Sequence, residues 1–271
     1  MWASLSRAIG ALSTGDAAER DFDLAAERIQ SALLNVTVPE IPGLDLGVHA
    51  EPARLVGGDY IDIFPSQGRL LFGLGDASGK SLAAALNALM LRYLVRGLVQ
   101  ALGCEDLESI LEHTNSVVTD DLRRTDQFIT LVLGAMEAGT GRLRIVNAGH
   151  EPPLILRAKA ADVEILSRHD IVLGVNDGVR YRVEETTLAP GDRAVIYTDG
   201  LTEASNDRGE LYTVERLREN FLAHRDLPAQ ALADALFDAV KTYSGAEMRD
   251  DATILVIRRV ASIKAVSSPS A

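Results

Sequence analysis

The order of strand-like and helical segments constrains the fold of this chain more than any other feature. Short apolar runs bounded by Gly and Pro predict strands that follow one another directly, with helical patterns in pairs between them. Because strands and helices do not alternate regularly, the pattern favours an α+β fold with antiparallel sheets and helix pairs packed outside them. The predicted strands span 44–51, 60–64, 69–74, 128–136, 142–147, 153–156, 163–166, 181–188, 194–198 and 252–259, and the predicted helices span 16–35, 81–102, 106–124, 213–223 and 228–243.

The domain organisation follows from the distribution of these patterns. The chain has 271 residues and shows neither a repeat nor a linker between residues 44 and 260, so one compact domain is predicted over 36–260. Residues 1–35 contain an amphipathic helix, which is expected to form a homodimer contact through residues 16–35 or to dock a partner; packing on its own domain is the alternative. The tail 261–271 is small and polar and is expected to be disordered.

Charge and cysteine content argue against several classes of protein. The chain carries 39 acidic and 27 basic residues, a formal charge of −12, which argues against binding to nucleic acid or to an anionic membrane. Its single cysteine, Cys104, excludes an internal disulfide and a cysteine-based metal site. The apolar run 82–102 is long enough to span a bilayer, but Arg92 and Arg96 favour a core helix. Without a visible signal peptide, the sequence predicts a cytoplasmic protein.

Acidic residues stand beside glycine or at the end of an apolar run at four places. A carboxylate at the end of a buried strand is unfavourable unless something compensates its charge, and converging carboxylates raise one another's pKa. A divalent cation such as Mg²⁺ or Mn²⁺ would remove this repulsion. Taken singly, each place is better explained as a Gly-Asp turn, and spacing alone does not show that the four converge. The four segments are Gly57-Gly58-Asp59, Gly75-Asp76, Thr198-Asp199-Gly200 and Asp250-Asp251.

Five motifs then suggest a family. In this order, GGDYIDIF, GLGDASGKS, NAGHEPPL, YTDGLTEA and RDDATILVI resemble the SpoIIE/RsbU-like branch of the metal-dependent PPM (type 2C) protein serine/threonine phosphatases. The resemblance covers roughly residues 25–260 and departs at Leu34-Asn35, where relatives usually have Leu-Pro. It implies a four-layer α-β-β-α sandwich of two antiparallel sheets flanked by helices, with two Mn²⁺ or Mg²⁺ ions at one end.

The resemblance also implies roles for individual residues. Asp76 would bridge both ions, Asp59 and the Ala77 carbonyl would serve the second ion, and Asp199 and Asp250 would complete the first. The catalytic set would be Asp76, Asp199 and Asp250. A water between the ions would have a lowered pKa and attack phosphorus, so no phosphoenzyme is required. Asp251, which directly follows Asp250, is the alternative ligand if the motif is aligned one residue later.

Further candidates are weighed against simpler roles. His150 would be a general acid, or a histidine held by a structural hydrogen bond. Arg54 and Lys80 would contact the phosphate, or be solvated surface cations. Ser78 is expected to cap the helix over 81–102. A nucleotide-binding loop over 74–81 is rejected because Leu74 stands where its first glycine is required.

The implied function is a protein serine/threonine phosphatase. The branch implies a phosphorylated STAS-domain anti-anti-sigma factor as substrate, in bacterial partner switching under an upstream regulator. The alternative is a non-catalytic interaction module that keeps the fold, and the intact acidic positions favour the enzyme. Because the helix over 81–102 follows Asp76 closely, its movement would shift a metal ligand.

Overall fold

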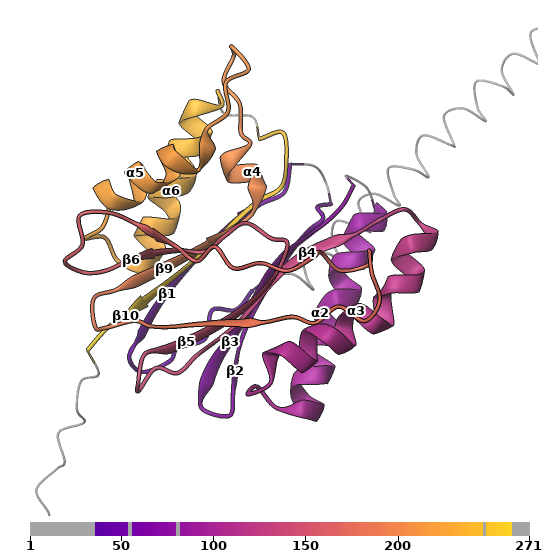
Figure 1. Cartoon of the computed structure of the whole chain (residues 1–271). Helices are drawn as coiled ribbons and strands as arrows, with labels where there is room; N and C mark the ends of the chain where they lie inside the picture. Colours follow the sequence, from indigo (N-terminus) through magenta and orange to yellow (C-terminus); the bar gives the residue numbers. More distant parts are fainter. Residues whose placement is uncertain (1–35, 54–55, 80–81, 246–247, 262–271) are drawn as a thin grey trace, which may run out of the picture.

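The computed structural model describes residues 36–53, 56–79, 82–245 and 248–261. The predicted helix over 16–35 and the predicted disordered tail beyond 261 lie outside these residues, as do Arg54 and Lys80. Within the described ranges, the strands and helices follow the order expected from the sequence (Figure 1).

Two five-stranded antiparallel sheets form the centre of the molecule. Sheet A has the order β1-β10-β9-β6-β7, and sheet B has the order β2-β3-β4-β5-β8. The strands of sheet A are β1 (Leu44–Glu51), β10 (Ala252–Arg259), β9 (Arg193–Tyr197), β6 (Leu154–Leu156) and β7 (Glu164–Ile165). The strands of sheet B are β2 (Asp59–Ser66), β3 (Arg69–Ala77), β4 (Ile129–Met136), β5 (Arg142–Ala148) and β8 (Val183–Thr187).

Local sequence explains the first hairpin of sheet B. The two residues between β2 and β3, Gln67 and Gly68, have φ values of 49° and 78°. Two consecutive positive φ values give the tight turn whose twist matches that of antiparallel strands. This turn fixes the register of the hairpin, which aligns Ser66 with Arg69 and, at the other end, Asp59 with Asp76.

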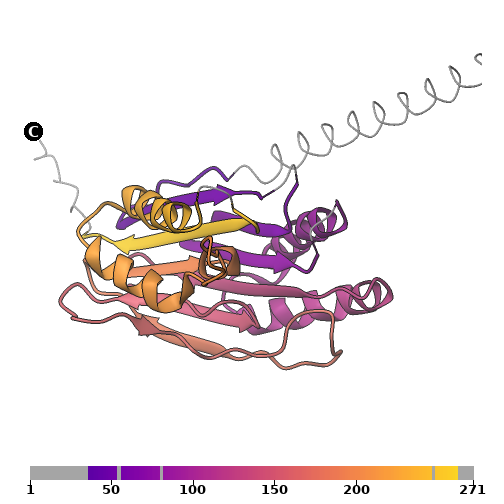
Figure 2. The same ribbon diagram turned by 90° about the horizontal axis from the view of Figure 1, so that it is seen from above.

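Helices cover the outer face of each sheet. The helices α2 (Leu82–Leu102) and α3 (Leu107–Arg124) pack on sheet B, whereas α4 (Asp199–Thr202), α5 (Thr213–Ala223) and α6 (Ala229–Tyr243) pack on sheet A. A third apolar cluster, which includes Phe72 and Ile196, fills the space between the sheets. Figures 1 and 2 show the two helix groups on opposite sides, so the predicted α-β-β-α sandwich is confirmed.

The helix α2 is a core helix in this fold. Its length and composition would also suit a membrane span. Its inner residues Ala84, Ala88, Leu91 and Val95 are instead fully buried against sheet B and α3. The arginines that interrupt the apolar run reach back to sheet B, as described below.

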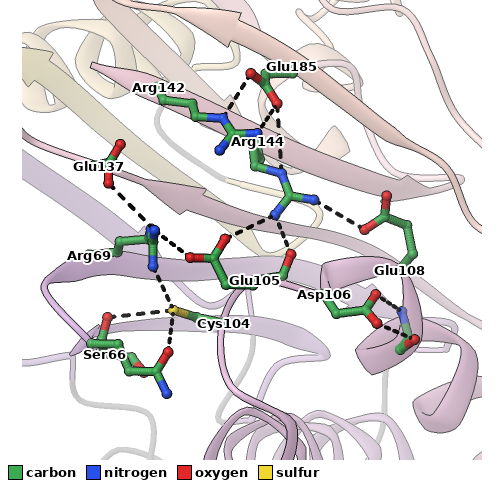
Figure 3. Close-up of polar contacts among 12 residues, drawn as sticks. Ser66, Arg69, Cys104, Glu105, Asp106, Glu108, Glu137, Arg142, Arg144 and Glu185 are labelled. Carbon is green, nitrogen blue, oxygen red and sulfur yellow. Dashed lines mark hydrogen bonds and ion pairs between the residues drawn. The ribbon is translucent and has the colours of Figure 1, made fainter. Parts of the chain in front are cut away.

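The turn between α2 and α3 is fastened to the end of sheet B by charged side chains (Figure 3). Arg69 of β3 and Arg144 of β5 both form ion pairs with Glu105 in this turn. Beneath them the thiol of Cys104 is fully buried, with its Sγ atom 3.4 Å from Gln67 Oε1. This buried position agrees with an inert thiol.

Two differences from the sequence-based expectation lie near the acidic residues. β3 continues through Asp76 and Ala77 instead of ending at residue 74, because Asp76 pairs with Asp59 on one side and both residues pair with β4 on the other. The short helix α4 was not predicted, since four residues are too few to show a helical period.

Candidate metal centre

Asp59 and Asp76 face each other across the first hairpin of sheet B. They are direct partners in the β2–β3 register, and Ala77 N donates a hydrogen bond to Gly58 O (3.2 Å). A Cβ atom on Gly58 would lie 2.7 Å from the Ala77 carbonyl oxygen and 3.1 Å from Asp76 Oδ1. Glycine is therefore required at this position, because any side chain would push apart two of the predicted ligands.

The Asp59 carboxylate connects this hairpin to sheet A. Its Oδ2 atom accepts hydrogen bonds from Thr253 Oγ1 (2.6 Å) and Thr198 Oγ1 (2.9 Å). Burial raises the pKa of Asp59 well above its usual value, and repulsion by Asp76 and Asp251 raises it further, while the two hydroxyls oppose this shift. An ionised Asp59 therefore needs a positive charge nearby.

Asp199 lies in a second acidic group, at the start of α4. Burial raises its pKa to about 6, with further contributions from Glu203, Asp250 and Glu151. The two groups meet at Thr198, which binds Asp59 through its hydroxyl and directly precedes Asp199. The acids of the four motifs thus lie at the same edge of the sandwich. Asp59 is in β2, Asp76 in β3 and Asp199 at the start of α4, and Asp250 precedes β10.

Glu151 and Glu203 were not singled out from the sequence. Glu203 follows Asp199 by one helical turn, and Glu151 lies close enough to Tyr197 for a 3.4 Å contact between its Oε2 atom and the tyrosine hydroxyl. The sequence signal for Glu203 is its position four residues after Asp199 in YTDGLTEA, a spacing that places two acids on one face of a helix.

The two adjacent acids before β10 differ in their surroundings. Asp251 accepts hydrogen bonds from Ala53 N (2.8 Å) at Oδ1 and from Gly58 N (2.6 Å) at Oδ2. Both of its carboxylate oxygens therefore hold the segment that leads into β2. Asp250 accepts a hydrogen bond from Asp251 N (3.0 Å) at Oδ1, and its charge contributes to the raised pKa of Asp199.

His150 is buried behind β4. Its Nδ1 atom lies 2.8 Å from Thr130 Oγ1, and its backbone amide donates to Asn147 Oδ1 (2.8 Å). Thr130 pairs with Asp76 in the β3–β4 register. Burial lowers the pKa of His150 to about 4, against a smaller opposing interaction with the Tyr197 backbone. The imidazole is therefore neutral near pH 7, whereas a general acid must hold a proton that it can donate.

Ser78 follows the end of β3. Its Oγ atom accepts a hydrogen bond from Phe128 N (2.9 Å), which fastens the end of β3 to the start of β4. Its role as a helix cap stays a prediction, because residues 80 and 81 lie outside the described ranges.

The donor set fits a hard divalent cation by its chemistry. All of the predicted ligands are oxygen atoms, and those at Asp59 and Asp199 belong to carboxylates whose raised pKa values would be relieved by a cation. Among the residues that the structure describes, no group of three or more His, Cys, Asp or Glu side chains is close enough to hold a metal ion as it stands. The acids form the two groups described above, on either side of Thr198.

Comparisons with known proteins agree with this fold. A family model for stage II sporulation protein E (SpoIIE) matches residues 66–260. The phosphoserine phosphatase RsbU of Bacillus subtilis (strain 168) is 27% identical over 239 residues, which cover 88% of this chain and 70% of RsbU.

Solved structures give the same result. The RsbU and RsbW domains of Rv1364c from Mycobacterium tuberculosis are 25% identical with a TM-score of 0.73, over 83% of this chain and 62% of that one. The SiaA-PP2C domain of Pseudomonas aeruginosa is 24% identical with a TM-score of 0.76, over 90% and 98%. The catalytic domain of the phosphatase PstP, in complex with two manganese ions, has a TM-score of 0.61 at 17% identity over 80% of this chain and 99% of that one.

The family match covers well over half of the chain and runs from the end of β2 through β10, so it includes α2 to α6, Asp76, Asp199 and Asp250, whereas β1 and Asp59 precede it. The solved RsbU and RsbW domains of Rv1364c and the SiaA-PP2C domain share the fold seen here. The chain therefore belongs to the SpoIIE family, in the RsbU-like branch of the metal-dependent PPM (type 2C) protein serine/threonine phosphatases.

Proposed function

We propose that this chain hydrolyses phosphoserine or phosphothreonine on a signalling protein, with two Mn²⁺ or Mg²⁺ ions held by Asp59, Asp76, the Ala77 carbonyl, Asp199 and Asp250. The observation that carries the proposal is the Asp59–Asp76 pair, two facing carboxylates at the edge where both sheets meet. When bound, the ions would supply an activated water and screen the phosphoryl oxygens.

The surrounding residues would position these ligands. Gly58 leaves room for the Ala77 carbonyl and the Asp76 carboxylate, and Thr198 and Thr253 fix the orientation of Asp59. Asp250 is the proposed ligand of this pair because its charge acts on Asp199, whereas Asp251 holds the backbone of the segment that leads into β2. Asp251 would then orient the segment that carries Gly58.

Removal of divalent ions is expected to abolish the activity. The test is release of phosphate from a phosphoserine protein by the full chain, first with EDTA and then with added Mn²⁺ or Mg²⁺. Activity should be absent with EDTA and return with the metal, because the ions would supply both the activated water and the charge that screens the phosphoryl oxygens. Activity that persists in EDTA would contradict the two-metal centre. A folded chain that binds its partner without turnover under any metal would instead support the non-catalytic interaction module.

The substrate proposal is a phosphorylated STAS-domain anti-anti-sigma factor in a cytoplasmic partner-switching pathway, under an upstream regulator. It is supported by the similarity to RsbU and by a structural neighbour that carries RsbU and RsbW domains. A phosphorylated STAS-domain protein should be dephosphorylated faster than an unrelated phosphopeptide of the same charge.

The segment before the phosphatase domain is proposed to mediate self-association. The proposed division is a regulatory or dimerisation segment over 1–35, the phosphatase domain over 36–260 and a tail over 261–271. The sequence of 16–35 is amphipathic, and on the domain itself Leu86 and Tyr93 of α2 are 56% and 57% exposed. Deletion of residues 1–35 should convert a dimer into a monomer in sedimentation velocity. A full chain that is already a monomer, and unchanged by the deletion, would contradict this proposal.

A further inference from the structure

A buried ion pair joins α2 to sheet B. Asp62 of β2 is only 1% exposed, and its two carboxylate oxygens accept hydrogen bonds from Arg96 Nε (2.5 Å) and Arg96 Nη2 (2.7 Å) of α2. Arg92, one helical turn earlier, places its Nη2 atom 3.6 Å from the same carboxylate. Arg96 also lies over the ring of Phe64, 5.0 Å from its centre.

The inner face of α2 contacts sheet B through small or aliphatic side chains, among them Ala84, Ala88 and Val95. Such apolar contacts are non-directional. A further polar contact of the helix, from Asn87 Nδ2 to Gln127 Oε1 (3.0 Å), reaches the segment before β4. A buried ion pair adds little net stability over an apolar replacement, but it satisfies its charges in a single alignment only. The pair therefore specifies where α2 lies along β2.

The position of α2 is transmitted to the acidic edge through Gly58. Asp62 lies three residues after Asp59 on the same strand. At the start of α2, a Cβ atom on Gly58 would lie 3.2 Å from the Ala84 Cβ atom and 2.7 Å from the Ala77 carbonyl oxygen. Gly58 thus sits where no side chain would fit, and Ala84 packs in the same apolar cluster as Ala77. A shift of α2 along the sheet would therefore change the packing around Ala77 and its hydrogen bond to Gly58 O.

We propose that Asp62 and Arg96 are positioning residues, which set α2 against β2 and thereby hold Asp59, Asp76 and the Ala77 carbonyl at the spacing that binds metal. The assignment of these groups as metal ligands rests on the proposed function, whereas the structural coupling between the ion pair and Gly58 does not.

The test compares Arg96→Met with Arg142→Met in the full chain. Arg142 makes an equally bidentate ion pair, with Nε and Nη2 each 2.8 Å from an oxygen of Glu185, but this pair joins β5 to β8 and does not involve α2. Arg92 remains 3.6 Å from the buried Asp62 carboxylate and Arg96 itself is 41% exposed, so a folded protein is expected after the substitution of Arg96. Arg96→Lys keeps the charge and loses the fork of donors.

Two readouts are expected to move in Arg96→Met. Hydrogen exchange at the Ala77 amide, measured without metal, should accelerate at least about fivefold. The Mn²⁺ concentration for half-maximal binding, measured by calorimetry, should rise at least about fivefold, while kcat at saturating Mn²⁺ stays within about twofold of the unsubstituted chain. Arg96→Lys should be intermediate, and Arg142→Met should leave both readouts unchanged.

The outcomes separate this inference from the proposed function. Unchanged exchange and unchanged Mn²⁺ affinity in folded Arg96→Met would overturn the positioning role and leave the proposed function intact. Equal changes in Arg142→Met would also overturn it, because the effect would then be one of general stability. An unsubstituted chain that binds no Mn²⁺ would overturn the proposed function, and the exchange measurement would still decide whether the ion pair is coupled to Ala77.

Discussion

Replacing Asp76 with Asn is expected to lower phosphatase activity by about three orders of magnitude or more, equivalent to about 4 kcal/mol of transition-state stabilisation. Asn has nearly the same shape as Asp but lacks the negative charge proposed to bridge the two ions. The measurement is phosphate release at saturating Mn²⁺, together with calorimetric titration of Mn²⁺ into the metal-free protein.

The substitution should not unfold the protein. Asp76 raises the pKa of Asp59 by repulsion, so loss of its charge relieves a cost in the metal-free state. Asp120→Asn is the matched control, since this acid is exposed on α3 and far in sequence from every predicted ligand. If folded Asp76→Asn keeps more than about a tenth of the activity, Asp76 does not bridge the ions.

Acid is expected to weaken Mn²⁺ binding, with the steepest change near pH 6. The pKa of Asp199 is raised to about 6, so below that pH a proton competes with the ion for this carboxylate. At subsaturating Mn²⁺, affinity at pH 5 should be about tenfold lower than at pH 7. Calorimetry is the measurement, because a phosphate monoester substrate also titrates near pH 6. An affinity that stays flat from pH 7 to pH 5 would contradict a role for Asp199.

The same shift has the opposite sign for the stability of the metal-free protein. Since the folded-state pKa of Asp199 lies above its usual value of 3.8, its ionisation costs stability, and this cost appears as the pH rises from about 4 through 6. Asp199→Asn removes the cost. We therefore expect this variant to melt at a higher temperature than the unsubstituted protein at pH 7 without metal, and at a similar temperature at pH 4.

The sequence was sufficient for most of the fold, because the signals were local. The apolar runs of β4 and β10 and the helical period of α6 are each long enough to identify the element without knowledge of its partners. The start of β2 and the end of β3 could not be predicted in this way. Asp59 and Asp76 are extended because they pair with each other across the hairpin, and Ala77 because it pairs with Ile129 of β4. Pairing between distant residues leaves no local pattern.

The candidate site shows the same difference between residues found in local motifs and contacts made between distant parts of the chain. The motifs identified Asp59, Asp76, Asp199 and Asp250, but not the hydroxyls of Thr198 and Thr253 that orient Asp59, because these contacts span 139 and 194 residues of sequence. The contrast between Asp250 and Asp251 likewise depends on backbone amides of residues 53 and 58. Arg92 and Arg96 were recognised only as charges that interrupt an apolar run, whereas their partner Asp62 became visible in the folded chain.

The buried thiol of Cys104, at the turn between α2 and α3, can be used to measure how often this turn opens. Cys104 is the only sulfhydryl in the sequence, and in the folded chain it is fully buried beneath the Arg69–Glu105 ion pair. An alkylating reagent can reach it only when this turn lifts from sheet B, so the rate of labelling measures how often that opening occurs. Opening of the helix pair, with metal or with a partner protein added, can therefore be followed by mass spectrometry on the natural sequence, with no engineered probe.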